Sequence, residues 1–434
     1  MSAEFFSVAR YKMALPADVP GVEGGIIFPS GIASHTLRRR ELDSQYPHLR
    51  RRLLDPQLYL QGLNPATARK TCGRLATYPW FPISGLEPYN SSKQRQSDWA
   101  RSAEAVIPQL WDSRVPSNQD VMARLIRSSL QFQSAAGCEA LVLPSPLTVD
   151  PATDYSTELK WCDLGLSLAH EVAPDKAALV TIALSDTALR SFDPWRSAFL
   201  DLLLDQLTAR VPAGAYIVLE SANEQGYYIT HPNTLGALLR LVHVLKSCGV
   251  GRIVVANVGI AGLVALGAGA DTWSTGWYRG ERRLKLADFE DSTGRAYPTY
   301  YSHQLASECN LETDLDKITG RGFLSSLSDI TEASTSLLRA LAAGNPASSV
   351  PEWTHRPSNV RACQEHFLRV ALRETLVLSP LAANERRGRV LTWLRAADDL
   401  SRKLFQVGSF NPRTELDHQA AWRTAFERYL EATG

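Results

Sequence analysis

The sequence predicts an α/β protein: a (β/α)8 barrel of parallel strands, followed by a helical C-terminal domain. Strand-like apolar segments begin near residues 139, 177, 215 and 252, at a spacing of about 37 residues, which is typical of a repeated strand-helix unit. Amphipathic stretches separate these segments, which indicates a parallel sheet buried on both faces. No G-x-G-x-x-G run follows a first strand, so a barrel is favoured over an open dinucleotide-binding sheet.

The second half of the barrel has the clearer pattern. Strands are expected over Glu139–Leu143, Ala177–Leu184, Ala215–Glu220, Arg252–Ala256 and Ala270–Thr275. Helix signals lie between them: Asp193 precedes Pro194, and Pro232 opens a helix that Gly249 ends. These signals alternate with the strands as a (β/α) repeat requires.

The upstream half completes the count with weaker segments. Gly25–Phe28, Leu53–Leu60 and Thr77–Ile83 are the expected first, second and third strands, although prolines interrupt the third. Eight strands by residue 276 match the length of one barrel, about 250 residues. We therefore assign residues 1–285 to the barrel.

Residues 286–434 have a different pattern, that of a helical domain. Beyond a polar stretch, helices are expected over Asp329–Ala343, Asn359–Leu378, Asn384–Phe405 and Asp417–Ala432. The segment 344–357 contains three prolines and is expected to be a linker. This domain is a candidate docking element for a protein partner.

Composition excludes several classes of protein. The chain has 434 residues and a net charge of +1, which rules out a histone-like polycation and a strongly acidic chain. The six cysteines are scattered without metal-ligand spacing, so we predict reduced thiols, a cytoplasmic location, no metal and no cofactor. No apolar run is long enough for a membrane span, and no membrane association is expected.

Carboxylates placed where barrel strands end are the candidate catalytic groups. Glu220 ends an apolar strand, Glu224 follows in the next loop, and Asp271 opens the last strand. A pair of carboxyl groups across a barrel mouth is what cleavage of a glycosidic bond requires. The competing interpretation of Glu220 is an ion pair inside the mouth with Arg279.

Other residues near the expected mouth are candidates for binding a substrate. The turn around Gly259 and Gly262 precedes a short helix, a place where many barrels hold phosphate on backbone N–H groups. The remaining candidates are polar or basic residues for substrate or phosphate and two aromatic residues for stacking: Asp55, Asp186, Asn257, Arg279, Arg282, Arg283, Trp273 and Trp277. Tight turns, a solvated basic loop and core aromatics are the competing explanation of these features.

Only nine of the 46 basic residues are lysines, and the arginines gather in short runs. These runs are Arg38–Arg40, Arg50–Arg52, the group Arg279, Arg282, Arg283 and Lys285, and the group Arg386, Arg387 and Arg389. Genome composition explains the excess of arginine. Bidentate binding of phosphate or carboxylate is the functional alternative.

The segment VANVGIAGLVALGAGADTWSTGWYRGERR, from Val255 to Arg283, resembles the closing strands of the tRNA-guanine transglycosylase barrel. In that family a V-G turn precedes a short helix, a G-x-D, an aromatic residue and arginines. The family's zinc-binding cysteines and D-S-G-G-F-Q run have no counterpart here, and Ser274 stands at about the place of its nucleophilic aspartate. The resemblance implies a barrel that handles bases or nucleotides, and it does not carry the transglycosylase activity over to this chain.

These observations lead to one functional hypothesis and two alternatives. The hypothesis is an enzyme acting on a glycosidic or N-glycosidic bond of a nucleotide-like or nucleic-acid substrate, or of a phosphorylated small molecule. The first alternative is a non-catalytic barrel that recognises nucleic acid or a protein partner in a larger assembly. The second is a carbohydrate hydrolase that uses the same carboxylates and has no affinity for polyanions.

Overall fold

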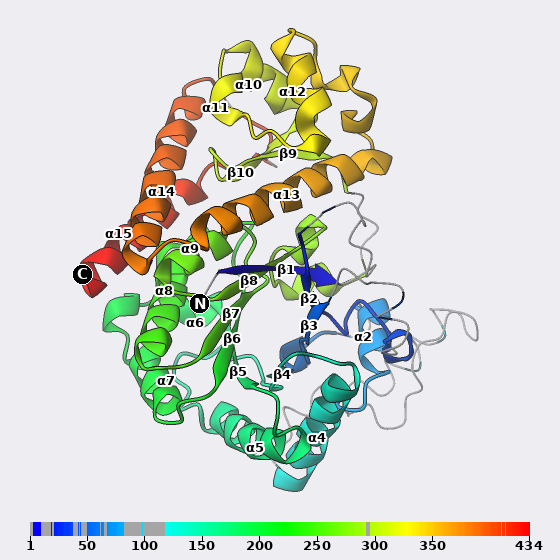
Figure 1. The fold of residues 1–434 in the computed structure, drawn as a ribbon, viewed down its shortest axis with the longest axis vertical. Helices are drawn as coiled ribbons and strands as arrows, with labels where there is room; N and C mark the ends of the chain where they lie inside the picture. Colours follow the sequence, from blue (N-terminus) through cyan, green and yellow to red (C-terminus); the bar gives the residue numbers. More distant parts are fainter. Residues whose placement is uncertain are drawn as a thin grey trace.

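The computed structural model describes residues 3–9, 19, 21–37, 42, 44, 50–60, 62–64, 67–81, 98, 102, 118–291 and 296–434, apart from 409 and 413. Eight parallel strands curl into a nearly closed barrel, and helices follow it in the chain (Figure 1). The strands are β1 (Glu4–Ala9), β2 (Gly24–Ile27), β3 (Arg51–Leu54), β4 (Leu141–Val142), β5 (Ala178–Ser185), β6 (Gly214–Glu220), β7 (Arg252–Ala256) and β8 (Thr272–Gly276). The predicted fold class is confirmed.

The two edge strands of the sheet approach each other and bring the barrel close to closure. The strand order is β3-β2-β1-β8-β7-β6-β5-β4, so β3 and β4 are the edges. The backbone N–H of Glu139, just before β4, donates to the carbonyl oxygen of Arg52 at 2.9 Å. This bond joins the edges near the N-terminal end of the barrel.

The helices around the barrel begin largely where the sequence signals them. They are α2 (Arg69–Leu75), α4 (Gln119–Ala135), α5 (Ser156–Val172), α6 (Asp186–Leu189), α7 (Ala198–Thr208), α8 (Pro232–Ser247) and α9 (Ala261–Ala268). Asp193 caps only a 3-10 turn at Pro194, and Ser197 caps the helix α7 that follows. Pro232 occupies the first turn of α8, as expected.

Two strand assignments in the upstream half are corrected. The chain's first strand is β1, which pairs with both β2 and β8. Its short segment EFFSVA contains Ser7 and has no continuous apolar run to mark it. Residues 77–81 of the expected third strand form turns after α2, and residues 82 and 83 lie outside the described part of the chain. Strand β3 ends at Leu54, before Pro56.

The C-terminal region begins with a hairpin that the sequence pattern did not predict. Strands β9 (Thr299–Ser302) and β10 (Ser307–Asn310) pair antiparallel. The helices α10 (Asp316–Gly320), α11 (Leu324–Leu327), α12 (Thr335–Ala342), α13 (Val360–Leu378), α14 (Ala383–Phe405) and α15 (His418–Thr433) follow. The three long helices agree with the predicted ranges within about two residues. The expected linker 344–357 contains two 3-10 turns.

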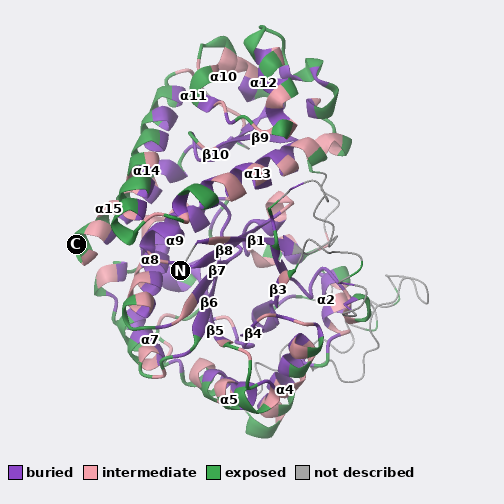
Figure 2. Cartoon of the chain, in the orientation of Figure 1, coloured by how far each residue is buried: buried purple, intermediate pink, exposed green. Residues whose placement is uncertain are grey.

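The helices α13, α14 and α15 share one hydrophobic core with the barrel. Phe367 of α13, Leu394 of α14 and Phe426 of α15 belong to the same buried cluster as the barrel strands. A second, smaller core lies around the β9–β10 hairpin and includes Tyr300 and Trp353. Figure 2 shows buried residues both in the barrel and on the inner sides of these helices. The long C-terminal helices thus serve as part of the barrel's outer layer.

The floor of the barrel, at the N-terminal ends of the strands, is a network of ion pairs. Arg51 of β3 and Arg252 of β7 each pair with both Glu4 of β1 and Glu139. The Arg51 and Arg252 guanidinium carbons lie 5.5 and 5.1 Å from the centroid of the Phe6 ring. This network links strands on opposite sides of the seam between β3 and β4.

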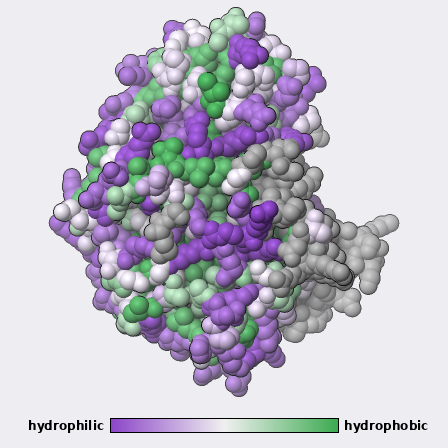
Figure 3. All heavy atoms as spheres, viewed as in Figure 1, coloured by the Kyte–Doolittle hydropathy of each residue, from purple (hydrophilic) through white to green (hydrophobic). Residues whose placement is uncertain are grey.

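Figure 3 shows one face of the molecule, where hydrophilic residues alternate with hydrophobic ones and a run of hydrophobic residues lies at the level of α13. Leu376 and Val377, near the end of α13, are exposed. Within the described ranges, no helix is long and apolar enough to cross a membrane.

Candidate active site

Glu220 lies at the barrel mouth, as the sequence predicts. It is the last residue of β6 and lies opposite Ser185, the last residue of β5, whose side chain hydrogen-bonds to it. Only 5% of its surface is exposed. Burial raises the pKa of the Glu220 carboxyl, and Asp186 adds to this effect, while Ser185 and Lys285 oppose it. Glu220 therefore holds a proton more readily than an ordinary glutamate.

Glu224 lies in the loop after β6 and is held by that loop. Its Oε2 accepts a hydrogen bond from the Thr230 hydroxyl, and its Oε1 accepts one from the backbone N–H of His231 at 3.3 Å. Lys285 donates to the Glu224 backbone carbonyl at 2.6 Å. The first two bonds hold the carboxylate in place, and the third holds the loop. Only 2% of the surface of Glu224 is exposed.

Asp186, the first residue of α6, anchors the same loop. Both of its carboxylate oxygens accept hydrogen bonds from the backbone N–H of Asn223, and one also accepts from the Asn223 side chain at 2.8 Å. Arg190 approaches the other oxygen at 3.9 Å. Asp186 is completely buried and shapes the loop that carries Glu224.

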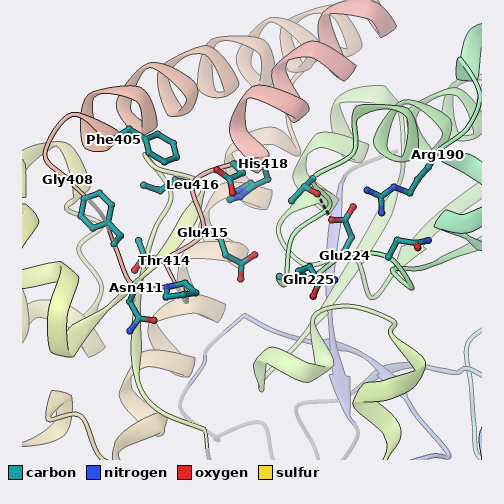
Figure 4. A pocket seen from close by; sticks show the side chains of 16 residues that line it. Arg190, Glu224, Gln225, Phe405, Gly408, Asn411, Thr414, Glu415, Leu416 and His418 are labelled. Carbon is teal, nitrogen blue, oxygen red and sulfur yellow. Dashed lines mark hydrogen bonds between the residues drawn. The ribbon is translucent and has the colours of Figure 1, made fainter.

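A cleft of about 620 Å³ lies between this loop and the segment 405–418, which joins α14 to α15. Figure 4 shows Glu224 and Glu415 on different walls, with their side chains projecting into the space between them. The described lining residues are Arg190, Asn223, Glu224, Gln225, Gly226, Thr230, Phe405, Gly408, Phe410, Asn411, Pro412, Thr414, Glu415, Leu416, Asp417 and His418. The cleft thus places two carboxyl groups around one space.

The Glu415 carboxylate is held closely by its neighbours. The backbone N–H of Tyr227 donates to both of its carboxylate oxygens, at 3.1 and 2.8 Å. A Cβ on Gly226 would collide with the Glu415 carboxylate, so glycine is required for this approach. Arg279 Nη2 lies 3.4 Å from Oε1. Burial raises the pKa of Glu415, although Arg279 and the Tyr227 N–H lower it.

The wall that holds Glu415 is tied to the β9–β10 hairpin. The Ser307 hydroxyl donates to the Glu415 carbonyl at 2.6 Å, and the Asn310 N–H donates to Thr414 Oγ1 at 2.8 Å. His418 bonds through Nε2 to the Ala306 carbonyl, and burial lowers its pKa to about 3. His418 is therefore neutral near pH 7 and adds no positive charge to the cleft.

Asp271 does not join the other two predicted catalytic carboxylates, and this expectation is corrected. It immediately precedes β8, at the N-terminal end of the barrel, whereas Glu220 ends β6 at the opposite end. Both of its oxygens accept from Lys246 at 2.8 Å, and one also accepts from the Ile253 N–H. Asp271 thus fastens α8 to the barrel floor.

Asp55 follows β3 and is buried inside the barrel. Its carboxylate accepts hydrogen bonds from the hydroxyls of Tyr59 and Tyr216, at 2.6 and 2.8 Å, and from the Gln57 N–H at 2.9 Å. Tyr216 belongs to β6, so this bond crosses the barrel interior. Burial raises the pKa of Asp55 to about 6, against the effect of these three bonds.

The three arginines expected to bind phosphate are instead paired with carboxylates of the protein. Arg279 and Arg282 lie 2.7 and 2.8 Å from Glu308 of β10, and Arg283 lies 2.9 Å from Asp288. Burial alone raises the pKa of Glu308, but Arg279 and Arg282 lower it to about 2. The two pairs with Glu308 join the barrel to the C-terminal hairpin, and the pair with Asp288 is local; together they correct the predicted phosphate-binding role. They also remove Arg279 as the expected partner of Glu220.

The glycine turn after β7 serves packing. Gly259 has a positive φ of 57°, and a Cβ there would lie 3.3 Å from the Arg282 carbonyl. A Cβ on Gly262 would collide with the ring of Trp273. Asn257 also has a positive φ, of 58°, and its N–H donates to Ser274 Oγ at 3.2 Å. Close approach of α9 to β8 explains Gly262 without a phosphate.

The two tryptophans expected to stack on a substrate pack against the protein. Trp273 is completely buried, and its Nε1 donates to Thr375 of α13 at 2.9 Å. Trp277 is partly buried against the main core. The predicted stacking role is therefore wrong for Trp273, whose ring is enclosed, and stays a prediction for the partly buried Trp277.

The other arginine runs are mostly structural where the structure describes them. Arg386 donates to the carbonyls of Leu378 and Ser379 and so caps the end of α13. Arg387 lies over the Tyr429 ring at 5.3 Å. Residues 38–40 lie outside the described ranges. The arginine excess therefore serves ion pairs and caps at several places in the fold.

A second cleft, of about 630 Å³, opens on another side of Arg279. Lys70 and Arg74 of α2 line it, and so do Arg279 and Arg282. Acidic residues among its described lining are Glu281, Asp288, Glu290, Asp291 and Glu308. Because charges of both signs line it, this cleft shows no preference for an anion.

Comparisons with known proteins assign no class to this barrel. No known protein family matches the chain, and no curated protein matches it. Among the residues that the structure describes, no group of three His, Cys, Asp or Glu side chains could hold a metal ion.

Glu415 is the main site residue that the sequence did not reveal. It lies in the loop between two predicted helices, about 195 residues after Glu220 in the chain. The only signal was the short polar segment between Phe405 and Asp417, which interrupts two strong helical patterns. Its position across the cleft from Glu224 depends on how α14 and α15 pack against the barrel.

Proposed function

We propose that the protein is an enzyme that hydrolyses or transfers a glycosidic bond in the cleft between the β6–α8 loop and the segment 405–418. The observation that supports this most is the pair Glu224 and Glu415, two fixed carboxyl groups on different walls of one cleft. Cleavage of a glycosidic bond needs two such groups, one to protonate the leaving oxygen and one to activate water or attack the sugar.

The surroundings of the two carboxyl groups suggest different roles. Glu415 is the proposed general acid, because burial raises its pKa and favours the protonated form. Glu224 is the proposed base or nucleophile, because the Thr230 hydroxyl and the His231 N–H donate to its carboxyl oxygens and hold them in place. Glu220 lies at the end of β6, behind the loop. Its proposed role is to influence the electrostatic potential around the two cleft carboxyl groups.

The two carboxyl groups support cleavage of a glycosidic bond. They give less support to a nucleotide-like or nucleic-acid substrate. The resemblance of residues 255–283 to a transglycosylase barrel favours an N-glycosidic bond. The ion pairing of Arg279, Arg282 and Arg283 leaves the phosphate part of that hypothesis with little support. A polyanion column distinguishes the versions: a nucleic-acid enzyme or recognition subunit should bind it and elute as salt rises.

The test is turnover of chromogenic aryl glycosides and of nucleosides by the wild-type chain and two variants. Glu224→Gln and Glu415→Gln should each lower kcat/KM by roughly 100-fold or more, as loss of a general acid or base does. Glu415→Gln should also remove the alkaline limb of the pH profile. The control is Glu431→Gln, an exposed carboxylate of α15. Full turnover by Glu224→Gln would refute the assignment.

A further inference from the structure

The charges around the cleft bear on the kind of substrate it accepts. Among its described lining residues Glu224 and Asp417 are acidic, beside the proposed general acid Glu415, and Arg190 is the basic one. His418 adds no charge, because burial lowers its pKa to about 3. An acidic lining repels phosphate and sulfate groups and is compatible with an uncharged ligand.

An exposed aromatic ring lies at the rim of the same cleft. Phe405, the last residue of α14, is 52% exposed and lines the cleft opposite the loop that carries Glu224 (Figure 4). Phe410 lies on the same wall, with the Lys317 ammonium 4.9 Å from the centroid of its ring. Phe405 is thus a large apolar side chain left in contact with water beside polar groups.

An aromatic ring beside hydrogen-bonding groups suits the two kinds of surface on a sugar. The face of a phenylalanine ring is electron-rich and attracts the C–H groups on the apolar face of a pyranose. Carboxylate oxygens accept hydrogen bonds from sugar hydroxyls, and the amide of Gln225 lies nearby in the lining. A cleft of about 620 Å³ falls within the usual range of small-molecule sites, about 300–1,000 Å³.

We propose that this cleft binds an uncharged carbohydrate, with Phe405 as the ring on which one sugar stacks and Glu224 as an acceptor for its hydroxyls. The inference rests on the proposed function only in placing the substrate in this cleft. Binding and turnover are separate measurements, so each proposal can fail alone.

The experiment measures binding by saturation-transfer NMR on the full chain, and turnover of the same probes is followed separately. The probes are the neutral disaccharides maltose, cellobiose and chitobiose, the uncharged nucleoside adenosine, and the anions glucose 6-phosphate and AMP. At least one neutral disaccharide should bind more tightly than adenosine and than either anion. Its affinity should change little with salt, because no ion pair with the ligand is involved.

Two variants and a control examine the stacking ring. Phe405→Ala should weaken disaccharide binding about tenfold, or about 1.4 kcal/mol, and Phe405→Trp should retain it. Leu376→Ala, at an exposed apolar residue of α13 outside the cleft, should bind as the wild type does. Because Phe405 is exposed, its truncation should leave the melting temperature unchanged.

The outcomes separate the two proposals. Disaccharide binding that Phe405→Ala weakens, without any turnover, supports the carbohydrate site and refutes the enzyme. Turnover with unchanged affinity in Phe405→Ala supports the enzyme and refutes the stacking site. Tighter binding of adenosine, AMP or glucose 6-phosphate, or no binding of any disaccharide, overturns the carbohydrate proposal.

Discussion

Replacement of Gly262 by alanine tests whether the turn after β7 is a packing device. Gly262 lies in α9, which is completely enclosed between the barrel and the C-terminal helices. An added Cβ would lie 2.5 Å from Cδ2 and 2.9 Å from Cβ of Trp273, and closer still to a third carbon of that ring. Trp273 cannot turn away freely, because its Nε1 is bonded to Thr375. The helix must therefore move away from β8.

The expected cost follows from three contributions. Overpacking of a filled core costs about 1–3 kcal/mol. Weakening the Trp273–Thr375 hydrogen bond adds about 1 kcal/mol, and alanine's better helix propensity returns about 1 kcal/mol. The net loss in free energy of unfolding should be about 2 kcal/mol.

Gly267 of the same helix is the matched control. A Cβ there would lie 3.0–3.1 Å from the outer atoms of Phe426 and Val390, which can yield by a few tenths of an ångström. Gly267→Ala should therefore change stability by less than about 1 kcal/mol. Urea unfolding followed by tryptophan fluorescence and circular dichroism compares the two variants. If Gly262→Ala is as stable as Gly267→Ala, the packing explanation is wrong. The predicted phosphate-binding role of the turn would then be favoured again.

Three further predictions concern the floor, the cleft and the barrel interior. Arg252→Met should destabilise the chain by about 1–2 kcal/mol in urea unfolding, because Glu139 loses one of its two partners, and 1 M salt should reduce the difference from wild type. Gly226→Ala should displace Glu415 and lower kcat/KM while leaving the urea midpoint nearly unchanged. An unaffected kcat/KM would contradict the close contact between Gly226 and the Glu415 carboxylate. The folded pKa of Asp55 is raised to about 6, so its contribution to stability is present below pH 4 and is lost as pH rises through 6. Relative to wild type, Asp55→Asn should gain up to about 3 kcal/mol between pH 3.5 and pH 7, and a constant difference in stability over this range would refute the raised pKa.

The strands from β4 to β7 could be predicted because each belongs to a buried apolar run followed by a helical segment. Strand β1 could not, because Ser7 interrupts a segment of six residues and nothing before it sets a period. The hairpin β9–β10 was missed for a similar reason. Its segments TYYS and SECN are polar and short, and their burial comes from the helices that pack over them.

The candidate site was only half visible in the sequence. Glu220 and Glu224 could be placed because a strand end fixes where the following residues lie. Asp271 was misplaced because it begins its strand rather than ending it, and only the direction of β8 separates the two ends of the barrel. Glu415 and the partners of Arg279 depend on contacts between residues about 30 to 190 positions apart, which no local pattern records.

The position of β1 has a consequence for how the chain is made. Among the eight barrel strands β1 is synthesised first, yet its neighbour β8 follows about 265 residues later, and α13, which packs against β1, comes later still. During synthesis the edge of Trp273 that bonds to Thr375 stays uncovered until α13 has left the ribosome. We therefore expect the nascent chain to bind chaperones until most of its length is complete, and a chain ended at residue 285 to aggregate.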